Sequence, residues 1–446
     1  INVPVDQPTI QAGINNSVSG DTVVVAPGEY FENINLNGKN ILLTSNFYLT
    51  SDYSDIANTI INGSTPTHID TASVILIISG ENASCIIQGF TITGGTGTKW
   101  LDEHGAGTYR EGGGILITES SPIIRYNYII NNHITNETGV ESTGGGGMRC
   151  GDSNVEIHNN VIINNEATGY GGGVVFNWCD HAIFKNNLVA YNSGGNDFGG
   201  GGLWATGSSS AQILDVTNCT ITNNISSGGG PYGGKGGGIY IFTISLNVLN
   251  CIIWDNSQTT GNAIYMAGGT LATNYSDIQN DVVGIGNINL DPLFLDTVMC
   301  FLIDTLSPCV DAGNPDIIYN DPEDELIEGI TYYPSHATVI NDIGVYGGPG
   351  RFQITDCPEI NPQVNINSNN GALIKAYPNP ADNLFVIEGN GIFSVSIFDE
   401  AGKLVLTKSN NNSKAIIDTS KLSTGIYFYE ISDHRKVKEN GKFIVE

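Results

Sequence analysis

The chain repeats one short pattern of apolar residues and asparagines, in RYNYIINN (125–132), HNNVIINN (158–165), KNNLVAYN (185–192), TNCTITNN (217–224) and LNCIIWDN (249–256). Each copy is followed by a glycine cluster and a short apolar run, as in GGGVVF (171–176) and GGGIYI (236–241). A unit of about 30 residues cannot bury its own apolar face, so such units must stack on one another. The repeat therefore predicts a parallel β-solenoid, in which each strand pairs with the same strand of the next coil.

The spacing of the repeat assigns side chains to columns that run along the solenoid. We expect an inward apolar column of Ile92, Ile129, Ile162, Val189, Ile221, Ile253 and Ile278. We expect an amide ladder at a bend, made of Asn132, Asn165, Asn192, Asn224 and Asn256. Stacked amides satisfy one another and neighbouring backbone groups where water cannot reach.

The ends of the stack are strand edges that need covers. Residues 8–17 have helical apolar spacing and predict a capping helix before the strand TVVVAPG. The whole N-terminal stretch, VPVDQPTIQAGINNSVSGDTVVVAPGEYFENI, resembles the cap and first coil of the right-handed parallel β-helix repeat proteins, and the resemblance implies the handedness. DPLFLD (291–296), SPCVDAGNPD (307–316) and NDIGVYGGPG (341–350) resemble the terminating segment of secreted members of that group. We therefore divide this part of the chain into a cap and first strand (1–30), the β-helix repeats (31–295) and a closing segment (296–356).

The last part of the chain is a different module. Residues 357–374 are rich in Asn, Pro and Ser and indicate a linker. Residues 375–446 carry equal numbers of acidic and basic residues, and AYPNPADNLFVIEG, SVSIFDEAGKLVL and IDTSKLSTGIYFYEI alternate as the strands of a small β-sandwich do. They resemble the C-terminal sorting domain of type IX secretion cargo in Bacteroidota. That resemblance implies export through the type IX machinery and a secreted or surface-attached product, and it places the sorting signal at Pro378, Asn379, Pro380, Gly402, Gly425 and Tyr427.

Composition limits the partners. The formal net charge is −28, which makes nucleic acid an unfavourable partner. No apolar run reaches the 18 or so residues that a membrane span needs. The chain starts at Ile1 without a basic and apolar leader, so we expect a signal peptide to have been removed.

The coil length varies only between each amide bend and the next glycine cluster, so the insertions gather on one face, where solenoids commonly bind ligands. The insertions carry the candidate ligand-binding residues Trp100, Tyr109, Arg110, Tyr170, Phe198 and Tyr232. Aromatic rings beside acids and amides suit sugars, which stack on rings and hydrogen-bond through hydroxyls. These rings could equally pack over their own loops, and that alternative stays open.

A cationic column of Arg125, His158 and Lys185 faces outward in the predicted register, and it supplies the candidate catalytic residues for a polysaccharide lyase. Ion pairs with Glu156 and Asp215 are the simpler interpretation. Asp152 and Asp180 could form an acid pair for hydrolysis. No motif of the pectate lyase, polygalacturonase or pectin esterase kind is present, so the enzyme hypothesis rests on fold analogy.

Three further kinds of site are expected from residue type alone. Asp311, Asp316 and Asp321 are candidate Ca²⁺ ligands in an acidic stretch without an EF-hand pattern, and a solvated acidic surface is the better interpretation. Asp-Thr-apolar tripeptides resemble the O-glycosylation acceptor of Bacteroidota at Thr71, Thr297 and Thr305. A disulfide is expected between Cys300 and Cys309, while Cys219 and Cys251 are either bridged or stacked thiols.

The sequence thus predicts an all-β protein with a right-handed parallel β-helix, an N-terminal capping helix and a C-terminal β-sandwich. The expected function is that of an exported carbohydrate-binding, adhesive or scaffold element whose partner is a polysaccharide or cell-surface glycan. Two alternatives are a polysaccharide lyase or hydrolase acting on acidic glycans and a structural filament or matrix subunit. No cofactor is expected, with Ca²⁺ left open.

Overall fold

A computed structural model describes residues 1–280, 283–295, 300–351, 375–377, 384–388, 393–399, 403–410, 414–433 and 436–445. The chain separates into two compact units, Ile1–Pro362 and Gln363–Glu446. We describe each unit by itself.

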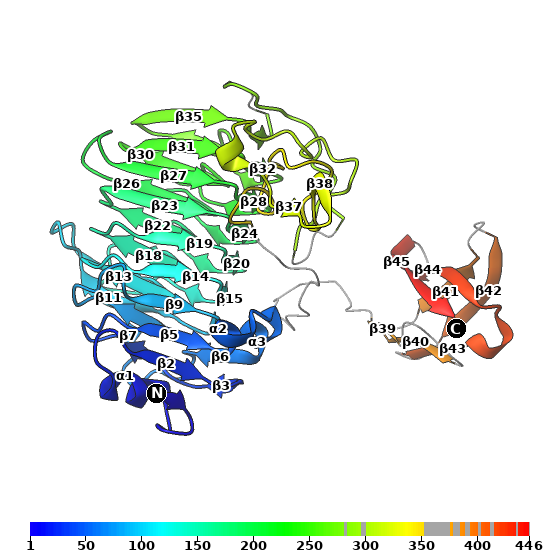
Figure 1. The fold of residues 1–446 in the computed structure, drawn as a ribbon, viewed down its shortest axis with the longest axis horizontal. Coiled ribbons are helices and arrows are strands. Elements are labelled where there is room, and N and C mark those ends of the chain that lie inside the picture. Colours follow the sequence, from blue (N-terminus) through cyan, green and yellow to red (C-terminus); the bar gives the residue numbers. More distant parts are fainter. Residues whose placement is uncertain are drawn as a thin grey trace. The chain divides into compact units, whose positions relative to one another are not determined.

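The first unit is a stack of coils whose strands form three long parallel sheets (Figure 1). Sheet A contains β1 (Asn2–Val3), β2 (Thr22–Val25), β5 (Leu42–Ser45), β9 (Ile86–Gln88), β14 (Ile123–Arg125), β19 (Glu156–His158), β23 (His181–Lys185), β27 (Ile213–Thr217), β31 (Ser245–Leu249) and β35 (Thr270–Asn274). Sheet B contains β3 (Gly28–Tyr30), β6 (Thr59–Asn62), β10 (Thr91–Thr93), β15 (Tyr128–Ile130), β20 (Val161–Ile163), β24 (Leu188–Ala190), β28 (Thr220–Thr222), β32 (Ile252–Trp254) and β36 (Asp277–Ile278). Sheet C contains β4 (Ile34–Asn35), β8 (Ile75–Ile77), β13 (Ile115–Thr118), β18 (Met148–Gly151), β22 (Val174–Asn177), β26 (Leu203–Thr206), β30 (Ile239–Phe242) and β34 (Ile264–Met266).

The predicted parallel β-helix is confirmed, and its core is the predicted apolar column. In sheet B, Ile129 pairs with Ile162, and the register continues to Val189 in the next coil. All members of the column are buried in one continuous hydrophobic core. Short apolar strands bury alternate side chains inward, and stacking the coils removes that surface from water.

A ladder of buried asparagines marks the bend after sheet B, as predicted. Asn132 Nδ2 donates to Asn165 Oδ1 at 3.0 Å, and Asn165 Nδ2 donates to Asn192 Oδ1 at 3.0 Å. The ladder continues to Asn224 at 2.9 Å and to Asn256 at 3.0 Å. Each amide also donates to a backbone carbonyl, so the buried polar groups of the bend are satisfied.

After the ladder, a five-stranded sheet of two-residue strands leads to the glycine clusters, and it contains β16 (His133–Ile134), β21 (Glu166–Ala167), β25 (Ser193–Gly194), β29 (Ile225–Ser226) and β33 (Ser257–Gln258). The coils pass close to one another here. A Cβ atom at Gly146 would lie 2.5 Å from the carbonyl oxygen of Gly172. Glycine is therefore required by the close approach of backbone to backbone, in addition to the left-handed φ of 64° at Gly145.

The N-terminal end is covered as predicted by α1 (Ile10–Asn16). Thr9 caps this helix, because its hydroxyl accepts a hydrogen bond from the N–H of Ala12 at 3.1 Å. The carboxylate of Glu32 accepts from the N–H groups of Ile10 and Gln11, and Ile10 and Ile14 are buried against the first coil.

The closing segment lies along the side of the helix and covers the outer face of sheet B, beside α2 (Phe47–Thr50) and α3 (Tyr53–Asn58) (Figure 1). Phe301 and Tyr346 share a hydrophobic cluster with Tyr128 and Leu188, whose side chains point outward from sheet B. Asn186 Nδ2 donates to the carbonyl oxygen of Gly347 at 2.8 Å. The segment contains a 3₁₀ turn (Ile317–Tyr319) and the hairpin of β37 (Glu323–Asp324) and β38 (Ile327–Thr331).

The predicted bridge between Cys300 and Cys309 is wrong. Cys309 is a buried free thiol whose Sγ lies 3.3 Å from Asp277 Oδ2, while Cys300 is disulfide-bonded to another cysteine. Cys219 and Cys251 are free and stacked: the N–H of Cys219 donates to the sulfur of Cys251 at 3.3 Å. They occupy the positions of Asn160 and Asn187 in earlier coils, where short side chains close a second ladder.

The second unit is the predicted β-sandwich of antiparallel sheets. One sheet contains β39 (Lys375–Tyr377), β40 (Leu384–Glu388) and β43 (Lys414–Asp418), and the other contains β42 (Leu404–Asn410), β41 (Phe393–Phe398), β44 (Gly425–Asp433) and β45 (Lys436–Val445). A further 3₁₀ turn spans Thr419–Lys421. The hydrophobic core of the second unit includes Phe385, Val395 and Tyr427, and the Tyr427 hydroxyl donates to the carbonyl oxygen of Ser423 at 3.0 Å. Of the sorting-signal residues, Gly425 begins β44, and Pro378, Asn379, Pro380 and Gly402 lie outside the described residues.

Candidate functional site

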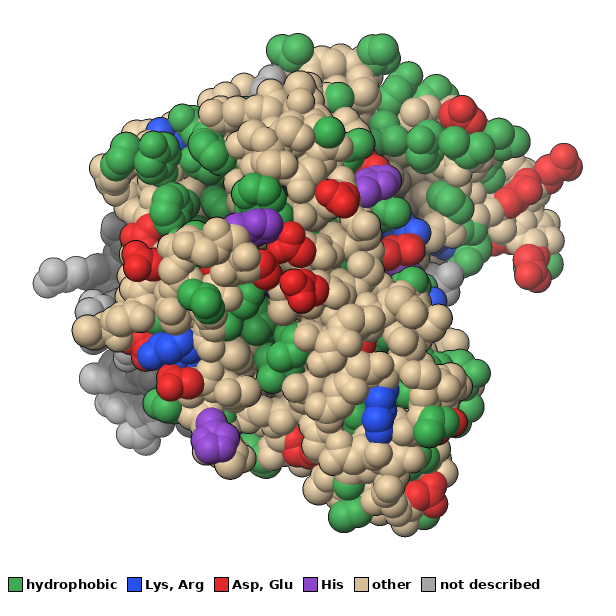
Figure 2. All heavy atoms as spheres, turned by 90° about the vertical axis from the view of Figure 1, so that its left-hand side faces the viewer, with side chains coloured by type: hydrophobic (Ala, Val, Ile, Leu, Met, Phe, Trp, Pro, Cys, Tyr) green, Lys and Arg blue, Asp and Glu red, His purple; other side chains and the backbone are tan. Residues whose placement is uncertain are grey.

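The insertions gather on the side of the β-helix formed by sheet C. The largest is a hairpin of β11 (Gly97–Leu101) and β12 (Thr108–Glu111), which pairs with β7 (Thr71–Ala72) and β17 (Thr143–Gly144). Figure 2 looks onto this side of the molecule, where acidic and histidine side chains lie beside hydrophobic ones. The sheet supplies a rigid floor, and the insertions supply walls.

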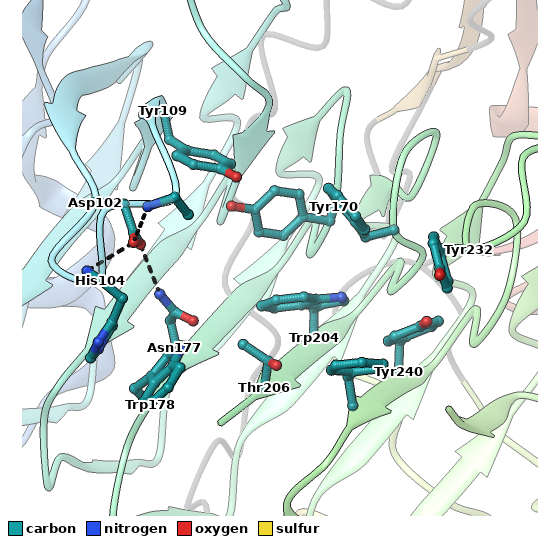
Figure 3. A pocket seen from close by; sticks show the side chains of 13 residues that line it. Asp102, His104, Tyr109, Tyr170, Asn177, Trp178, Trp204, Thr206, Tyr232 and Tyr240 are labelled. Carbon is teal, nitrogen blue, oxygen red and sulfur yellow. Dashed lines mark hydrogen bonds between the residues drawn. The ribbon is translucent and has the colours of Figure 1, made fainter. Parts of the chain in front are cut away.

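A cleft of about 530 Å³ lies between these walls, and we call it the aromatic cleft (Figure 3). Its lining residues are Asp102, His104, Ala106, Tyr109, Tyr170, Asn177, Trp178, Phe198, Trp204, Thr206, Tyr232, Tyr240 and Phe242. Four of the six predicted binding residues are among them: Tyr109, Tyr170, Phe198 and Tyr232.

Rings in the aromatic cleft contact one another. Tyr170 packs on Trp204 with ring centroids 4.7 Å apart, and Phe198 stacks on Tyr232 at 6.2 Å. Tyr170 and Tyr240 are buried, whereas Tyr232 is 50% exposed and offers its ring to a ligand. Burial raises the pKa of Tyr109, with the carboxylates of Glu111 and Asp102 adding to the effect, so its hydroxyl is a neutral donor at physiological pH.

The sequence interpretation missed the floor of the cleft. Trp204 and Tyr240 occupy one outward column of sheet C, because Trp204 pairs with Tyr240 across β26 and β30. Trp178 follows the same sheet at the end of β22. The sequence did contain a signal for this floor. In GGLWAT and GGIYIF, the aromatic residue directly follows the first apolar residue of the strand, and the alternation of side chains along a strand places it on the outer face.

Trp100 lies behind the wall of the cleft and does not line it. Its Nε1 donates to Glu111 Oε2 at 2.9 Å, and its ring lies 4.0 Å from the Arg149 guanidinium carbon. Arg149 is fully buried and forms two 2.8 Å hydrogen bonds to Glu103. Burial raises the pKa of Glu111, whose carboxylate lies 3.2 Å from Arg149 Nε and accepts a hydrogen bond from the Tyr170 hydroxyl. This buried network fixes the hairpin to sheet C.

Arg110 also turns away from the cleft. Its guanidinium donates to Asp70 at 2.9 Å and to Glu137 at 3.0 Å, and it bonds the carbonyl oxygens of Ile69 and Gly97 at 2.8 Å. The side chain is 5% exposed, so it braces the hairpin and does not face a ligand in the cleft.

A histidine and two aspartates stand at one end of the cleft. The ring of His104 stacks on Trp178 with centroids 3.8 Å apart, and its Nε2 lies 3.0 Å from Asp152 Oδ1. Burial raises the pKa of the Asp152 carboxyl, against the opposing effect of His104. Asp102 accepts from the N–H of His104 at 2.9 Å and from Asn177 Nδ2 at 3.4 Å.

A second cavity, of about 240 Å³, adjoins this end, and we call it the polar cavity. It is lined by Asp152, Ser153, Asn154, Trp178, Asp180, Ser208 and Gln212. Trp178 lines both cavities. The predicted acid pair of Asp152 and Asp180 is thus brought to one cavity.

The cationic column of Arg125, His158 and Lys185 has the expected register on sheet A, away from the cleft. Each member has a partner. Lys185 pairs with Glu156 at 2.6 Å, and Arg125 Nε donates to Gln88 Oε1 at 2.7 Å. Burial lowers the pKa of His158, whose Nδ1 lies 2.8 Å from Asn159 Oδ1. The expected ion pair with Glu156 forms at Lys185, whereas Asp215 pairs with His181 at 2.7 Å and not with the column.

The acidic closing segment uses its carboxylates internally. Asp311 accepts from the N–H and hydroxyl of Thr338, and Asp321 accepts from the N–H of Asp342 at 3.1 Å. Asp316 caps the 3₁₀ turn. Within the described ranges there is no group of three or more His, Cys, Asp or Glu side chains that could hold a metal ion. Asp321 and Asp342 are buried, so this part of the acidic stretch is not the solvated surface that the sequence predicted.

The glycosylation candidates differ in how well they are placed. Thr71 and Thr305 are exposed, as an acceptor must be. Thr297 lies outside the described residues. Occupancy of these sites stays a prediction.

Comparison with known proteins identifies the tail. Residues 375–446 match the family model of the secretion system C-terminal sorting domain. No curated protein sequence matches the chain. Among solved structures, the chain is similar to a pectin methylesterase mutant crystallised with a hexasaccharide, at 12% identity and a TM-score of 0.24, over 62% of this chain and 88% of the other.

The molecule is therefore a β-helix protein with a sorting tail. The tail directs the chain to the type IX secretion machinery, and the protein is secreted or attached to the cell surface. No helix in the described part of the chain is long and apolar enough to cross a membrane.

Proposed function

We propose that the aromatic cleft binds a carbohydrate chain and that the protein acts outside the cell as a glycan-binding or adhesive element. The observation that carries the proposal is the concentration of aromatic rings with amide, hydroxyl and carboxylate groups in one open cleft. Sugar rings present apolar C–H faces that pack on aromatic side chains, and their hydroxyls need donors and acceptors at the rim.

The cleft provides both kinds of contact. Tyr232 and Phe242 are partly exposed rings on one wall and the floor. Asn177 and Thr206 stand beside Trp204 and supply polar groups (Figure 3). The buried Arg149–Glu103 pair holds the opposite wall in place, so the cleft is formed before a ligand arrives and less entropy is lost on binding.

Cleavage of the bound glycan is a second candidate function, and one observation favours it. His104 Nε2 contacts both carboxylate oxygens of Asp152, at 3.0 and 3.1 Å. A carboxylate that holds one ring nitrogen leaves the other free to act as a general base. The dyad lies at the end of the cleft, where a bound chain would pass.

Affinity electrophoresis against a panel of soluble polysaccharides tests the binding proposal. We expect retention by at least one polymer, and we expect Tyr232→Ala to weaken it by roughly 5- to 10-fold through loss of one stacked ring. Tyr48→Ala is the matched control, because Tyr48 is similarly exposed at 53% and lies in α2, outside the cleft. Equal retention of both variants, or no retention of any polymer, would refute the proposal. Reducing ends measured in the same samples, and lost in His104→Ala, would move the protein to the polysaccharide-cleaving enzymes.

A further inference from the structure

The polar cavity is lined by Gln212, whose side-chain amide group is held in place by Ser208. Gln212 is 7% exposed. Its Oε1 accepts from the N–H of Ser208 at 2.6 Å and from the Ser208 hydroxyl at 3.2 Å, which fixes the orientation of the amide. Gln212 lines the cavity, and no described residue accepts a hydrogen bond from its Nε2. Nε2 is not among the described side-chain atoms that are shielded from solvent and lack a partner, so the amide N–H₂ can donate to a ligand or to water in the cavity.

The same cavity is lined by carboxylates that can accept hydrogen bonds. The carboxylate of Asp180 lines the cavity and has no hydrogen bond or ion pair within the described residues. Asp152 lines it as well and is held by His104. A donor and acceptors around one small space match a sugar hydroxyl or amide substituent, because each of these groups both gives and accepts hydrogen bonds.

Trp178 joins the polar cavity to the aromatic cleft. It lines both, and its backbone has a left-handed φ of 58°. Glu119 and Asp152 have left-handed φ values of 49° and 46° at the equivalent position of the two preceding coils, so this conformation is the regular bend after the strand of sheet C. The bend places the indole ring of Trp178 at the boundary between the two cavities.

The charges around the two cavities disfavour the binding of anionic glycans such as polyuronates. Among the described residues of the walls, Arg110 and Lys99 pair with Asp70 and Glu137, and Arg149 pairs with Glu103. Lys235 donates to the carbonyl oxygen of Pro231 at 2.8 Å and lies 4.6 Å from the Tyr265 ring centroid. A uronate would meet Asp152 and Asp180, and these wall cations of the described residues already have partners, so repulsion between like charges would disfavour it.

We propose that the polar cavity is a second sugar subsite, continuous with the aromatic cleft across Trp178, that takes an uncharged sugar unit through Gln212 as donor and Asp180 as acceptor. The protein therefore binds neutral glycans and rejects polyuronates. This inference rests on the proposed function and specifies its ligand class.

Calorimetric titration of the full chain with three probes tests it: cellohexaose, N-acetylated chitohexaose and hexagalacturonate. We expect one of the neutral hexasaccharides to bind at least about tenfold more tightly than hexagalacturonate. Gln212→Glu keeps the size of the side chain but removes the hydrogen-bond donor. We expect it to weaken the affinity for the neutral ligand at least about fivefold. Asp180→Asn removes the charge of the carboxylate. We expect it to reduce the difference in affinity between the neutral hexasaccharide and hexagalacturonate.

Glu325→Gln is the matched control, because it removes one exposed charge in the closing segment, outside both cavities. Equal or tighter binding of hexagalacturonate by the unaltered protein, no binding of either neutral probe, or unchanged affinity in both Gln212→Glu and Asp180→Asn would overturn the inference. Failure of the subsite alone is recognisable, because Tyr232→Ala would still weaken binding while the polar-cavity variants would not. Thermal unfolding of each variant separates lost contacts from lost fold.

Discussion

The guanidinium of Arg149 meets the carboxylate of Glu103 in two hydrogen bonds of 2.8 Å, one from each terminal nitrogen. Arg149 is in β18 of sheet C, and Glu103 is in the turn of the β11–β12 hairpin. The pair therefore fastens the largest insertion to the rigid floor of the aromatic cleft.

Glu103→Gln should loosen this attachment. The variant leaves a fully buried guanidinium with a weaker partner, and hydrogen bonds to charged groups contribute about 1.5–3 kcal/mol each. We expect a lower free energy of unfolding, by about 2 kcal/mol, in urea titrations, together with weaker glycan binding. Glu325→Gln is the control for loss of one charge. Unchanged stability in Glu103→Gln would show that the hairpin is held by other contacts.

Asn192→Ala should destabilise the β-helix more than an exposed asparagine would. The Asn192 amide accepts from the backbone N–H of Asn165 and donates to the carbonyl oxygen of Ile162, so its removal takes these partners from two polar groups of the preceding coil. We expect a loss of about 2–4 kcal/mol in the free energy of unfolding. Asn16→Ala, at an exposed position in α1, should change stability by less than about 0.5 kcal/mol. Equal effects of the two substitutions would contradict the ladder's role.

The thiols should be inert in the folded protein. Cys85, Cys150, Cys179, Cys219, Cys251 and Cys309 are buried and free. Burial raises the pKa of Cys85 and that of Cys179 to about 12, so neither forms the reactive thiolate near neutral pH. Ellman's reagent at pH 8 should titrate none of the six before unfolding and all six in guanidinium without reductant. A count of four after unfolding would indicate a further disulfide, such as one between Cys219 and Cys251.

The closing segment should make stability depend on pH. Burial raises the pKa of Asp321 to about 7. Burial, together with the neighbouring carboxylate of Asp321, raises the pKa of Asp342 to about 8. A carboxyl whose pKa is higher in the folded state stabilises the fold below its unfolded pKa, and that contribution is lost as the pH rises through 7 and 8.

We therefore expect a higher thermal midpoint at pH 6 than at pH 9. General charge repulsion acts in the same direction, so Asp342→Asn is compared with Glu325→Gln. The rise between pH 9 and pH 6 should shrink in Asp342→Asn and persist in Glu325→Gln. The same pH profile in both variants would show that the buried pair does not control it.

The repeat made the fold predictable. Its spacing placed Ile129, Ile162 and Val189 in one inward column, and it placed Asn132 and Asn165 in one ladder, because stacked coils permit only one register. The tail was predictable for a different reason, since its sequence resembles a sorting domain over its full length. The position of the closing segment was not predictable, because it depends on an apolar outer face of sheet B that the repeat does not distinguish from a solvated one.

The candidate site was predictable only in part. Loop position identified Tyr109, Tyr170 and Tyr232, but it could not tell a ring that faces the cleft from Trp100, which packs against Arg149. Trp204 and Tyr240 were missed because the candidate binding residues were taken from the insertions, whereas these two lie on regular strands of sheet C. The spacing along the chain does not show which outward column of side chains the insertions cover, because that depends on how the insertions fold in three dimensions.

A crystal structure of the protein with the neutral oligosaccharide that binds it most tightly tests the central claim directly. The account predicts sugar rings in the aromatic cleft, packed on Tyr232 and Trp178, with one unit hydrogen-bonded to Gln212 and Asp180 in the polar cavity. Sugar bound elsewhere, for example over Arg125, His158 and Lys185 on sheet A, with the cleft empty, would contradict it.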